Sequence, residues 1–353
     1  MPKALSEKIR VLLTYVMIAA VVAINQHAFA ATAAKDDFDL SNDQPLLEPL
    51  VLPDWFKLSF LDLRDDLHDA NANKRGLILY FGRHDCPYCK ALLEKNWGTP
   101  DIVTYTRAHF DVVAIDVLGN RTLTDLDGKE YTEKDFAIAN EAHFTPTLFI
   151  YDNRGKLALK LTGYRPPYQF RAALEYAADH HQLQESFRSY LARAETAYSY
   201  GQDSLNQDPQ FHPPAFLTDY RQHKHDKPLL VAFERRRCHA CDVLHAGPLN
   251  DPQIQKLLDS VDAVQLDMWR DVPVVTPAGK HLTSKAWADE LDLSYAPTLI
   301  FYDSEGKEII RLDSVVGFYR LHGVLRYVIS GGYRQYPNYQ QWRSLSGSKG
   351  PSS

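Results

Sequence analysis

Two stretches of the chain carry continuous runs of apolar residues, at 76–81 and 228–233. Such runs are typical of strands that are buried on both faces of a sheet. Each run is followed by a cysteine pair and a segment with helical spacing, and a second apolar run ends at Asp116 or Asp267. The pattern therefore predicts a buried strand, a helix and a second strand in each of two regions.

The remainder of each region also alternates between helix and strand patterns. A Gly-Lys turn precedes a helix for which Thr132 or Thr283 is a suitable N-cap, because its hydroxyl can accept from a free backbone N–H group. A Pro-Thr-Leu strand, a tight turn at 153–155 or 304–306, a last strand and an amphipathic helix follow. We therefore predict an α/β fold in each region, with a mixed central sheet flanked by helices on both faces.

The second region repeats the first. The matching positions are offset by 152 residues at the cysteines and by 151 after them. The matched segments are 77–81 with 229–233, 86–89 with 238–241, 128–129 with 279–280, 146–152 with 297–303, and 155–156 with 306–307. A constant offset over such a length indicates a duplicated domain.

The first thirty residues have the pattern of an export signal. Three basic residues precede a mostly apolar stretch at 11–24, and the Ala-Phe-Ala at 28–30 is the small-x-small pattern that a signal peptidase reads. The apolar stretch is shorter than the roughly 20 residues that span a bilayer, although an uncleaved membrane anchor remains the alternative. We expect a periplasmic or secreted protein that begins near Ala31, in a compartment where disulfides persist.

The predicted organisation of the chain follows from the repeat and from shifts in composition. The segment at 200–214 is rich in turn formers and polar residues, which is typical of a linker, and the polar ends favour disorder. The predicted parts are a signal peptide at 1–30, a flexible segment at 31–45, a first domain at 46–199, a linker at 200–214, a second domain at 215–343 and a disordered tail at 344–353.

Composition excludes several classes of protein. The chain has 353 residues, of which 45% are hydrophobic and 24% charged, so it is neither a disordered chain nor a membrane protein with many spans. Its formal net charge of −6 gives no reason to expect nucleic acid as a partner. The four cysteines are too few for a scaffold held together by disulfides.

All four cysteines fall in two Cys-x-x-Cys pairs, Cys86 with Cys89 and Cys238 with Cys241, each at the predicted start of a helix. Free backbone N–H groups and the helix dipole favour a thiolate at the first position. The second cysteine lies one turn later on the same face, close enough to form a disulfide with the first. Each pair therefore has the arrangement of a reversible two-electron switch.

With these motifs, each copy resembles a thioredoxin-fold domain, in particular the bacterial periplasmic thioredoxins of sulfur oxidation and disulfide exchange. The resemblance rests on the strand, the cysteine pair and the helix, together with Thr145-Pro146 and Ala296-Pro297. It implies a cis peptide bond before Pro146 and Pro297, and it implies that Thr145, Pro146, Ala296 and Pro297 help to bind a substrate strand beside the cysteines.

The chain also departs from the cytoplasmic thioredoxins. Tyr80 and Ala232 stand where those proteins have a buried aspartate, six positions before the first cysteine. Glu234 is a candidate for part of that proton-handling role in the second copy, while Gly82 occupies the matching place in the first.

Flanking charges predict that the two pairs differ. Lys90 follows the first pair and Asp242 the second, but the arginines at 235–237 and His239 would stabilise the Cys238 thiolate. Because a stabilised thiolate makes its disulfide more oxidising, we expect the second pair to be the more oxidising one. The alternative is that these arginines form a solvated loop edge.

The sequence thus predicts an exported thiol–disulfide oxidoreductase in which Cys86 and Cys238 attack and Cys89 and Cys241 resolve. No bound cofactor is required, since the partners are protein or small-molecule thiols and disulfides. The resemblance adds a membrane electron donor of the bacterial disulfide-reducing type as a candidate partner. The direction of electron flow and the oligomeric state are left open.

Three other interpretations of the cysteines stay open. They could form structural disulfides, although a loop this small restrains the unfolded chain little. Cys238, Cys241 and His245 could ligate a metal, although the spacing of the two pairs does not match a zinc ribbon. The repeats could also be a binding or scaffold module with passive cysteines.

Overall fold

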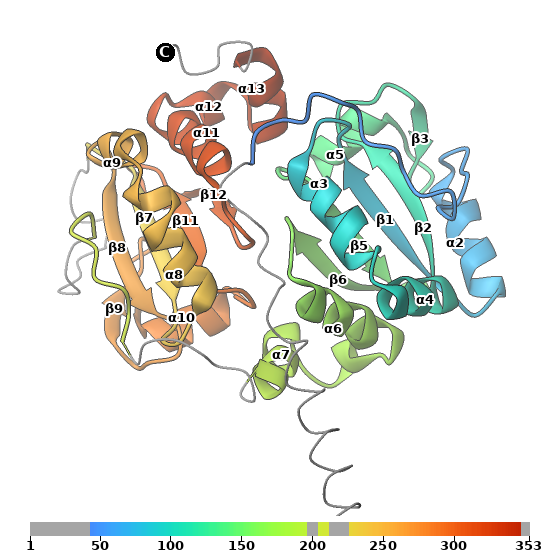
Figure 1. Ribbon diagram of the computed structural model, residues 1–353, viewed down its shortest axis with the longest axis horizontal. Helices are drawn as coiled ribbons and strands as arrows, with labels where there is room; N and C mark the ends of the chain where they lie inside the picture. The colour runs from blue at the N-terminus through green and yellow to red at the C-terminus, as the bar shows by residue number, and fades with distance from the viewer. Residues whose placement is uncertain (1–42, 196–203, 212–225, 347–353) are drawn as a thin grey trace, which may run out of the picture. The chain divides into compact units, whose positions relative to one another are not determined.

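The computed structural model describes residues 43–195, 204–211 and 226–346, all within one compact unit, Leu40–Ser353 (Figure 1). The expected signal peptide, most of the segment at 31–45, parts of the linker and the end of the tail lie outside the described residues. The described residues contain no helix long and apolar enough to cross a membrane.

In the first copy, helices flank a four-stranded sheet, and two short strands form a separate sheet. Its elements are α2 (Leu63–Ala72), β1 (Gly76–Gly82), α3 (Pro87–Ala91), a π-helical turn (Leu92–Asn96), α4 (Pro100–His109), β2 (Phe110–Asp116), β3 (Thr122–Thr124), β4 (Glu130–Thr132), α5 (Glu133–Ala139), β5 (Thr147–Tyr151), β6 (Leu157–Thr162), α6 (Pro167–Ala178), a 3₁₀ turn (His181–Leu183) and α7 (Phe187–Glu195).

From β7 (Leu229–Glu234) onwards, the described elements of the second copy follow the order of the first copy from β1. They are β7, α8 (His239–Ala246), a 3₁₀ turn (Pro248–Asn250), α9 (Pro252–Leu258), β8 (Asp262–Asp267), β9 (Pro273–Val275), β10 (His281–Thr283), α10 (Ser284–Glu290), β11 (Thr298–Tyr302), β12 (Glu308–Leu312), α11 (Phe318–Ile329), α12 (Gly332–Gln335) and α13 (Tyr339–Ser346).

The two main sheets have the same topology. Their strand orders are β2-β1-β5-β6 and β8-β7-β11-β12. In each sheet the first two strands of the copy are parallel and the other neighbours are antiparallel. The prediction of two mixed sheets with flanking helices is therefore confirmed.

The apolar runs form central strands because both of their faces are covered. Every residue of β1 and β7 is buried. In the second copy, Leu230 and Ala232 face a core that includes Ile254 of α9 and Leu325 of α11. Alternate residues of the same strand face a second core that includes Trp287 of α10. The strand-to-helix turns after β1 and β7 place the cysteine pairs at the edge of these cores.

Local sequence signals also act as expected. The Thr132 hydroxyl accepts from the N–H of Asp135, and the Thr283 hydroxyl accepts from the N–H of Ala286, so both threonines cap their helices. The turns before β6 and β12 place Gly155 and Gly306 at positive φ.

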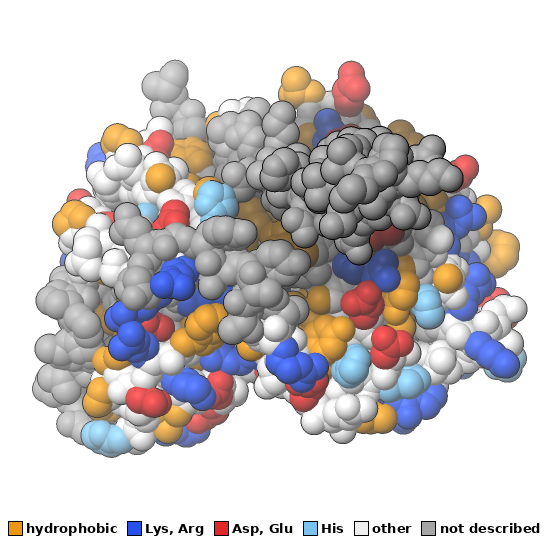
Figure 2. Space-filling model, turned by 60° about the horizontal axis from the view of Figure 1, so that its bottom comes forward, with side chains coloured by type: hydrophobic (Ala, Val, Ile, Leu, Met, Phe, Trp, Pro, Cys, Tyr) orange, Lys and Arg blue, Asp and Glu red, His pale blue; other side chains and the backbone are white. Residues whose placement is uncertain are grey.

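Two described segments pack where the sequence suggested flexibility. Phe211, within the expected linker, is only 8% exposed and belongs to the core of the second copy. Asp43, within the expected flexible N-terminal segment, is 3% exposed. On the face drawn in Figure 2, the described Lys and Arg side chains are interspersed with Asp and Glu, so this face has no extended patch of one charge.

Candidate active sites

The first cysteine pair lies at the start of α3. Cys86 is the N-cap residue, and its sulfur accepts from the backbone N–H of Cys89 at 3.0 Å. The two residues form a disulfide with their Cα atoms 5.2 Å apart. Cys86 is 4% exposed and Cys89 is fully buried, so a partner reaches Cys86 first.

The second pair repeats this geometry at the start of α8. Cys238 is the N-cap residue, its sulfur accepts from the N–H of Cys241 at 3.1 Å, and the two form a disulfide. Their exposures are 4% and 1%. In both copies the fold therefore directs a backbone N–H at the sulfur of the first, less buried cysteine, which we call the outer sulfur. This N–H would stabilise a thiolate there after reduction.

The residues that precede the two prolines lie against the cysteine pairs. The Thr145–Pro146 and Ala296–Pro297 peptide bonds are both cis. The carbonyl oxygen of Thr145 lies 3.4 Å from the Cys86 sulfur, and that of Ala296 lies 3.6 Å from the Cys238 sulfur. The structure thus brings together all eight residues that the sequence singled out, four at each site.

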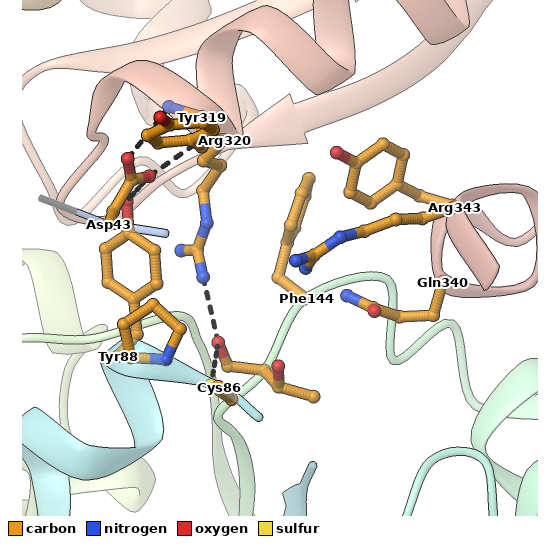
Figure 3. Close-up of a pocket in the computed structure, with 11 residues that line it drawn as sticks. Asp43, Cys86, Tyr88, Phe144, Tyr319, Arg320, Gln340 and Arg343 are labelled. Carbon is orange, nitrogen blue, oxygen red and sulfur yellow. Dashed lines mark hydrogen bonds between the residues drawn. The ribbon is translucent and has the colours of Figure 1, made fainter. Parts of the chain in front are cut away.

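The first site is partly covered by residues from the second copy. A pocket beside Cys86 is lined by Asp43 and Tyr88, and by Arg320 and other residues of α11 and α13 (Figure 3). The Tyr88 hydroxyl donates to Asp43 at 2.6 Å and accepts from the Gly317 N–H at 2.7 Å. Burial raises the pKa of Tyr88 well above its ordinary value, so its hydroxyl stays protonated and keeps this donor role.

The residues between the two cysteines are more exposed at the second site. His239 is exposed where Pro87 is half-buried, and Ala240 is half-buried where Tyr88 is buried. A shallow pocket beside Ala296 is lined in part by Trp269, which is 42% exposed, and by Arg235, whose guanidinium lies 5.0 Å from the centre of the Trp269 ring.

A buried carboxylate lies at the end of the strand that leads to the second pair. Glu234 ends β7 with no exposed surface, and its side chain contacts His245 Nε2 at 2.8 Å and Gln265 Nε2 at 3.1 Å. His245 Nδ1 lies 3.2 Å from Asp208. Burial alone would lower the pKa of His245. Glu234 and Asp208 outweigh this effect through their hydrogen bonds and their charges, so the pKa of His245 is raised above its ordinary value.

The contacts of His245 bear on the alternative in which Cys238, Cys241 and His245 ligate a metal. Both ring nitrogens of His245 face carboxylates, so the histidine does not join Cys238 and Cys241 as a third ligand. Within the part of the chain that the structure describes, no group of three or more His, Cys, Asp and Glu side chains could hold a metal ion. His223 and His225, two further histidines of this region, lie outside the described residues.

Two residues at the first site were missed by the sequence reasoning. Asp43 and Arg320 are far from Cys86 along the chain, so no local motif connects them with it. One signal was present: Arg320 falls on the same face of its helix as the buried residues Val324 and Val328, where a charge needs a partner.

Comparisons with known proteins agree with this fold. A family model of a thioredoxin-like domain matches the chain twice, at residues 63–178 and 220–329. A search of curated proteins found no match. Among solved structures, a thioredoxin-fold protein from Helicobacter pylori is 23% identical, covers 38% of this chain and 92% of that chain, and has a TM-score of 0.30.

Two further structures are more distant in sequence. A DsbH oxidoreductase is 14% identical, with coverage of 36% and 90% and a TM-score of 0.27. The C-terminal domain of Neisseria meningitidis DsbD in the reduced form is 18% identical, with coverage of 31% and 90% and a TM-score of 0.25. Since the family model matches both copies and more than half of the residues, the chain belongs to the thioredoxin-like domain family.

Proposed function

We propose that the protein is an exported thiol–disulfide oxidoreductase with two active sites. The observation that carries this proposal is the position of Cys86 and Cys238, whose sulfurs each accept from the N–H of the partner cysteine at the first turn of a helix. A sulfur in that position ionises more readily than an ordinary thiol, and the thiolate is the form that attacks disulfides.

The exchange follows from the pairing of a slightly exposed cysteine with a more deeply buried one. In the reduced protein the Cys86 thiolate attacks a substrate disulfide, forms a mixed disulfide and releases one substrate thiolate. The Cys89 thiolate then attacks the Cys86 sulfur, releases the second substrate thiolate and closes the Cys86–Cys89 disulfide. Two electrons pass from the cysteine pair to the substrate, and the reverse sequence oxidises a substrate dithiol. Cys238 and Cys241 would act in the same way.

We assign substrate positioning to Thr145, Pro146, Ala296 and Pro297. This assignment is supported by the contact of the Thr145 and Ala296 carbonyl oxygens with the outer sulfurs of the two pairs. A substrate strand that enters beside these residues would present its own sulfur to Cys86 or Cys238 at short range.

The proposal also covers the compartment in which the protein acts and the partners with which it exchanges disulfides. The basic start, apolar stretch and Ala-Phe-Ala of the first thirty residues support export to the periplasm or secretion. The substrates would be protein or small-molecule thiols and disulfides, and a membrane electron donor is the candidate for keeping the pairs reduced. No bound cofactor takes part in this chemistry.

Reduction of insulin in the presence of dithiothreitol tests the activity. The mature chain should accelerate precipitation of the insulin B chain, each of Cys86→Ser and Cys238→Ser should remove part of the rate, and the double variant should have none. If the double variant is as active as the parent, or the parent does not exceed the dithiothreitol background, the cysteines are passive and the scaffold interpretation holds.

A further inference from the structure

The first cysteine pair has a cation beside it that comes from the other copy. Arg320, on α11, donates from Nη2 to the carbonyl oxygen of Thr145 at 2.8 Å. The same oxygen lies 3.4 Å from the Cys86 sulfur. The guanidinium nitrogen therefore lies within about 6 Å of that sulfur, in the range where an opposite charge favours the ionised form of a group.

The guanidinium is held in place on several sides. Its central carbon lies 3.5 Å from the centre of the Tyr88 ring and 5.3 Å from that of Phe144, and Nη1 is 3.5 Å from Ser314 Oγ. Figure 3 shows the side chain extended from α11 between these two rings towards Cys86. Arg320 is 8% exposed, so the rings and the carbonyl fix both its position and its direction.

Burial does not remove the charge of Arg320. Desolvation lowers the pKa of its guanidinium more than Tyr88 and Asp43 raise it, but an arginine does not lose its proton in a protein. The Asp43 carboxylate accepts from the N–H groups of Tyr319 and Arg320 at the start of α11 and from the Tyr88 hydroxyl. Its charge is thus compensated at the helix start, at the opposite end of the Arg320 side chain from the sulfur (Figure 3).

Several other charged and titratable groups surround this site. Arg83 pairs with Asp85, and Lys90 is exposed and 3.9 Å from Glu94. His143 is buried, which lowers its pKa and keeps it neutral. The remaining ones are His84 on the loop before Cys86, and Tyr339 and Arg343 from α13.

The first copy has a neutral residue at the helix position that Arg320 occupies in the second copy. Helices α6 and α11 have the same length and are offset by 151 residues at both ends, which matches Arg320 with the neutral Gln169. Arg188, which lines the pocket beside Ala296, donates to the carbonyl oxygens of Leu293 and Met268. Arg236, one of the arginines before Cys238, pairs with Asp267.

We propose that Arg320 is a positioning residue for the first active site: it holds the Thr145 carbonyl and stabilises the Cys86 thiolate from the second copy. A stabilised thiolate favours the reduced pair, so the Cys86–Cys89 disulfide becomes the more oxidising of the two. This order is the reverse of the one expected from flanking charges. The proposal rests on the thiol–disulfide exchange proposed above.

The test uses the mature chain with Cys238→Ser and Cys241→Ser, so that one reducible pair remains. The rate of Cys86 alkylation by iodoacetamide against pH gives the thiol pKa, and equilibration with glutathione gives the redox equilibrium constant. Arg320→Met should raise the Cys86 pKa by at least one unit, which corresponds to about a tenfold shift of the glutathione equilibrium towards the disulfide at a pH above both pKa values. Arg320→Lys, which keeps the charge, should recover most of both changes.

Two controls separate the charge from the contact between the copies. Gln340→Ala removes hydrogen bonds to Arg83 and to the His143 carbonyl without removing a charge near Cys86, and Arg326→Met removes an exposed charge from the same helix. Both should leave the Cys86 pKa within 0.3 units of the parent value, about a twofold change. An equal effect of Gln340→Ala and Arg320→Met would overturn the proposal, as would an unchanged pKa in Arg320→Met.

Failure of the proposed function would look different. In that case the parent would not exchange with glutathione, whereas alkylation would still report the effect of Arg320 on Cys86. If Arg320→Met does not fold, the test compares the two sites with Arg320 intact. The thiol pKa of each outer cysteine is measured with the opposite pair replaced by serine, and the proposal requires a lower pKa at Cys86 than at Cys238. Equal or reversed values would overturn it.

Discussion

Replacement of Glu234 by glutamine should destabilise the second copy in a pH-dependent way. The Glu234 carboxylate is fully buried and has two side-chain partners, His245 and Gln265. Glutamine keeps the shape but removes the charge, and its amide cannot accept from both partners at once. His245 would keep only Asp208 as a charged partner.

The magnitude follows from the contact that is lost. A hydrogen bond to a charged group contributes about 1.5–3 kcal/mol, and breaking a buried ion pair from one side costs about 3–5 kcal/mol. Because Asp208 remains, we expect a loss of about 3 kcal/mol in the free energy of unfolding. For a domain of this size that corresponds to roughly 6–12 °C in Tm.

The sign of the pH dependence follows from the raised pKa of His245. A group whose pKa is higher in the folded state stabilises the fold fully below its unfolded pKa, and that contribution is lost as the pH rises through the folded pKa. The difference between the parent and Glu234→Gln should therefore be largest at a pH well below the imidazole pKa and should shrink above it.

Urea unfolding followed by circular dichroism measures this difference, at one pH well below the imidazole pKa and at one above it. The exposed Glu305→Gln is a matched control and should change the free energy of unfolding by less than about 0.5 kcal/mol. A loss below about 1 kcal/mol for Glu234→Gln at the lower pH, or a loss that does not shrink as the pH rises, would refute the assignment of a charged pair.

Three further outcomes are expected. Cys89→Ser and Cys241→Ser should each accumulate mixed disulfides, because the attacking sulfur remains while the resolving one is lost. The adducts should shift on a non-reducing gel and vanish with dithiothreitol. The absence of adducts in both variants would contradict the assigned roles. N-terminal sequencing of exported protein should begin at Ala31, whereas a start at Met1 would favour an uncleaved anchor. Thr283→Ala removes the N-cap of α10 and should lower the free energy of unfolding by about 1 kcal/mol in urea titrations; a change below about 0.3 kcal/mol would mean that the cap is dispensable.

Those parts of the fold that depend on local patterns could be predicted from the sequence. The run that became β7 is apolar throughout because helices cover both sides of the strand, and Thr283 was identifiable as a cap because its hydroxyl serves a neighbour three residues away. The duplication strengthened both predictions, since each pattern occurs twice. The cysteine and proline residues of each site were identified from a motif together with a family resemblance.

The surroundings of the first site could not be predicted in this way. Arg320 contacts Thr145, and Asp43 contacts the start of α11, only because the second copy packs against the first. Contacts between residues so far apart in the chain have no spacing to detect. Flanking charges favour the second pair as the more oxidising one, whereas the structure pairs Arg236 with Asp267 and places Arg320 beside Cys86.

One face at the end of β1 and β7 differs between the two copies. Residues two apart on a strand share a face, so Tyr80 and Gly82 lie on one face of β1, as Ala232 and Glu234 do on β7. The Tyr80 ring covers Gly82 so closely that a Cβ atom there would lie 2.5 Å from it. A large side chain at the first position thus excludes one at the second, and the small Ala232 leaves room for a carboxylate. The first copy therefore has no acid at this place, whereas the second copy has its own buried acid and histidine.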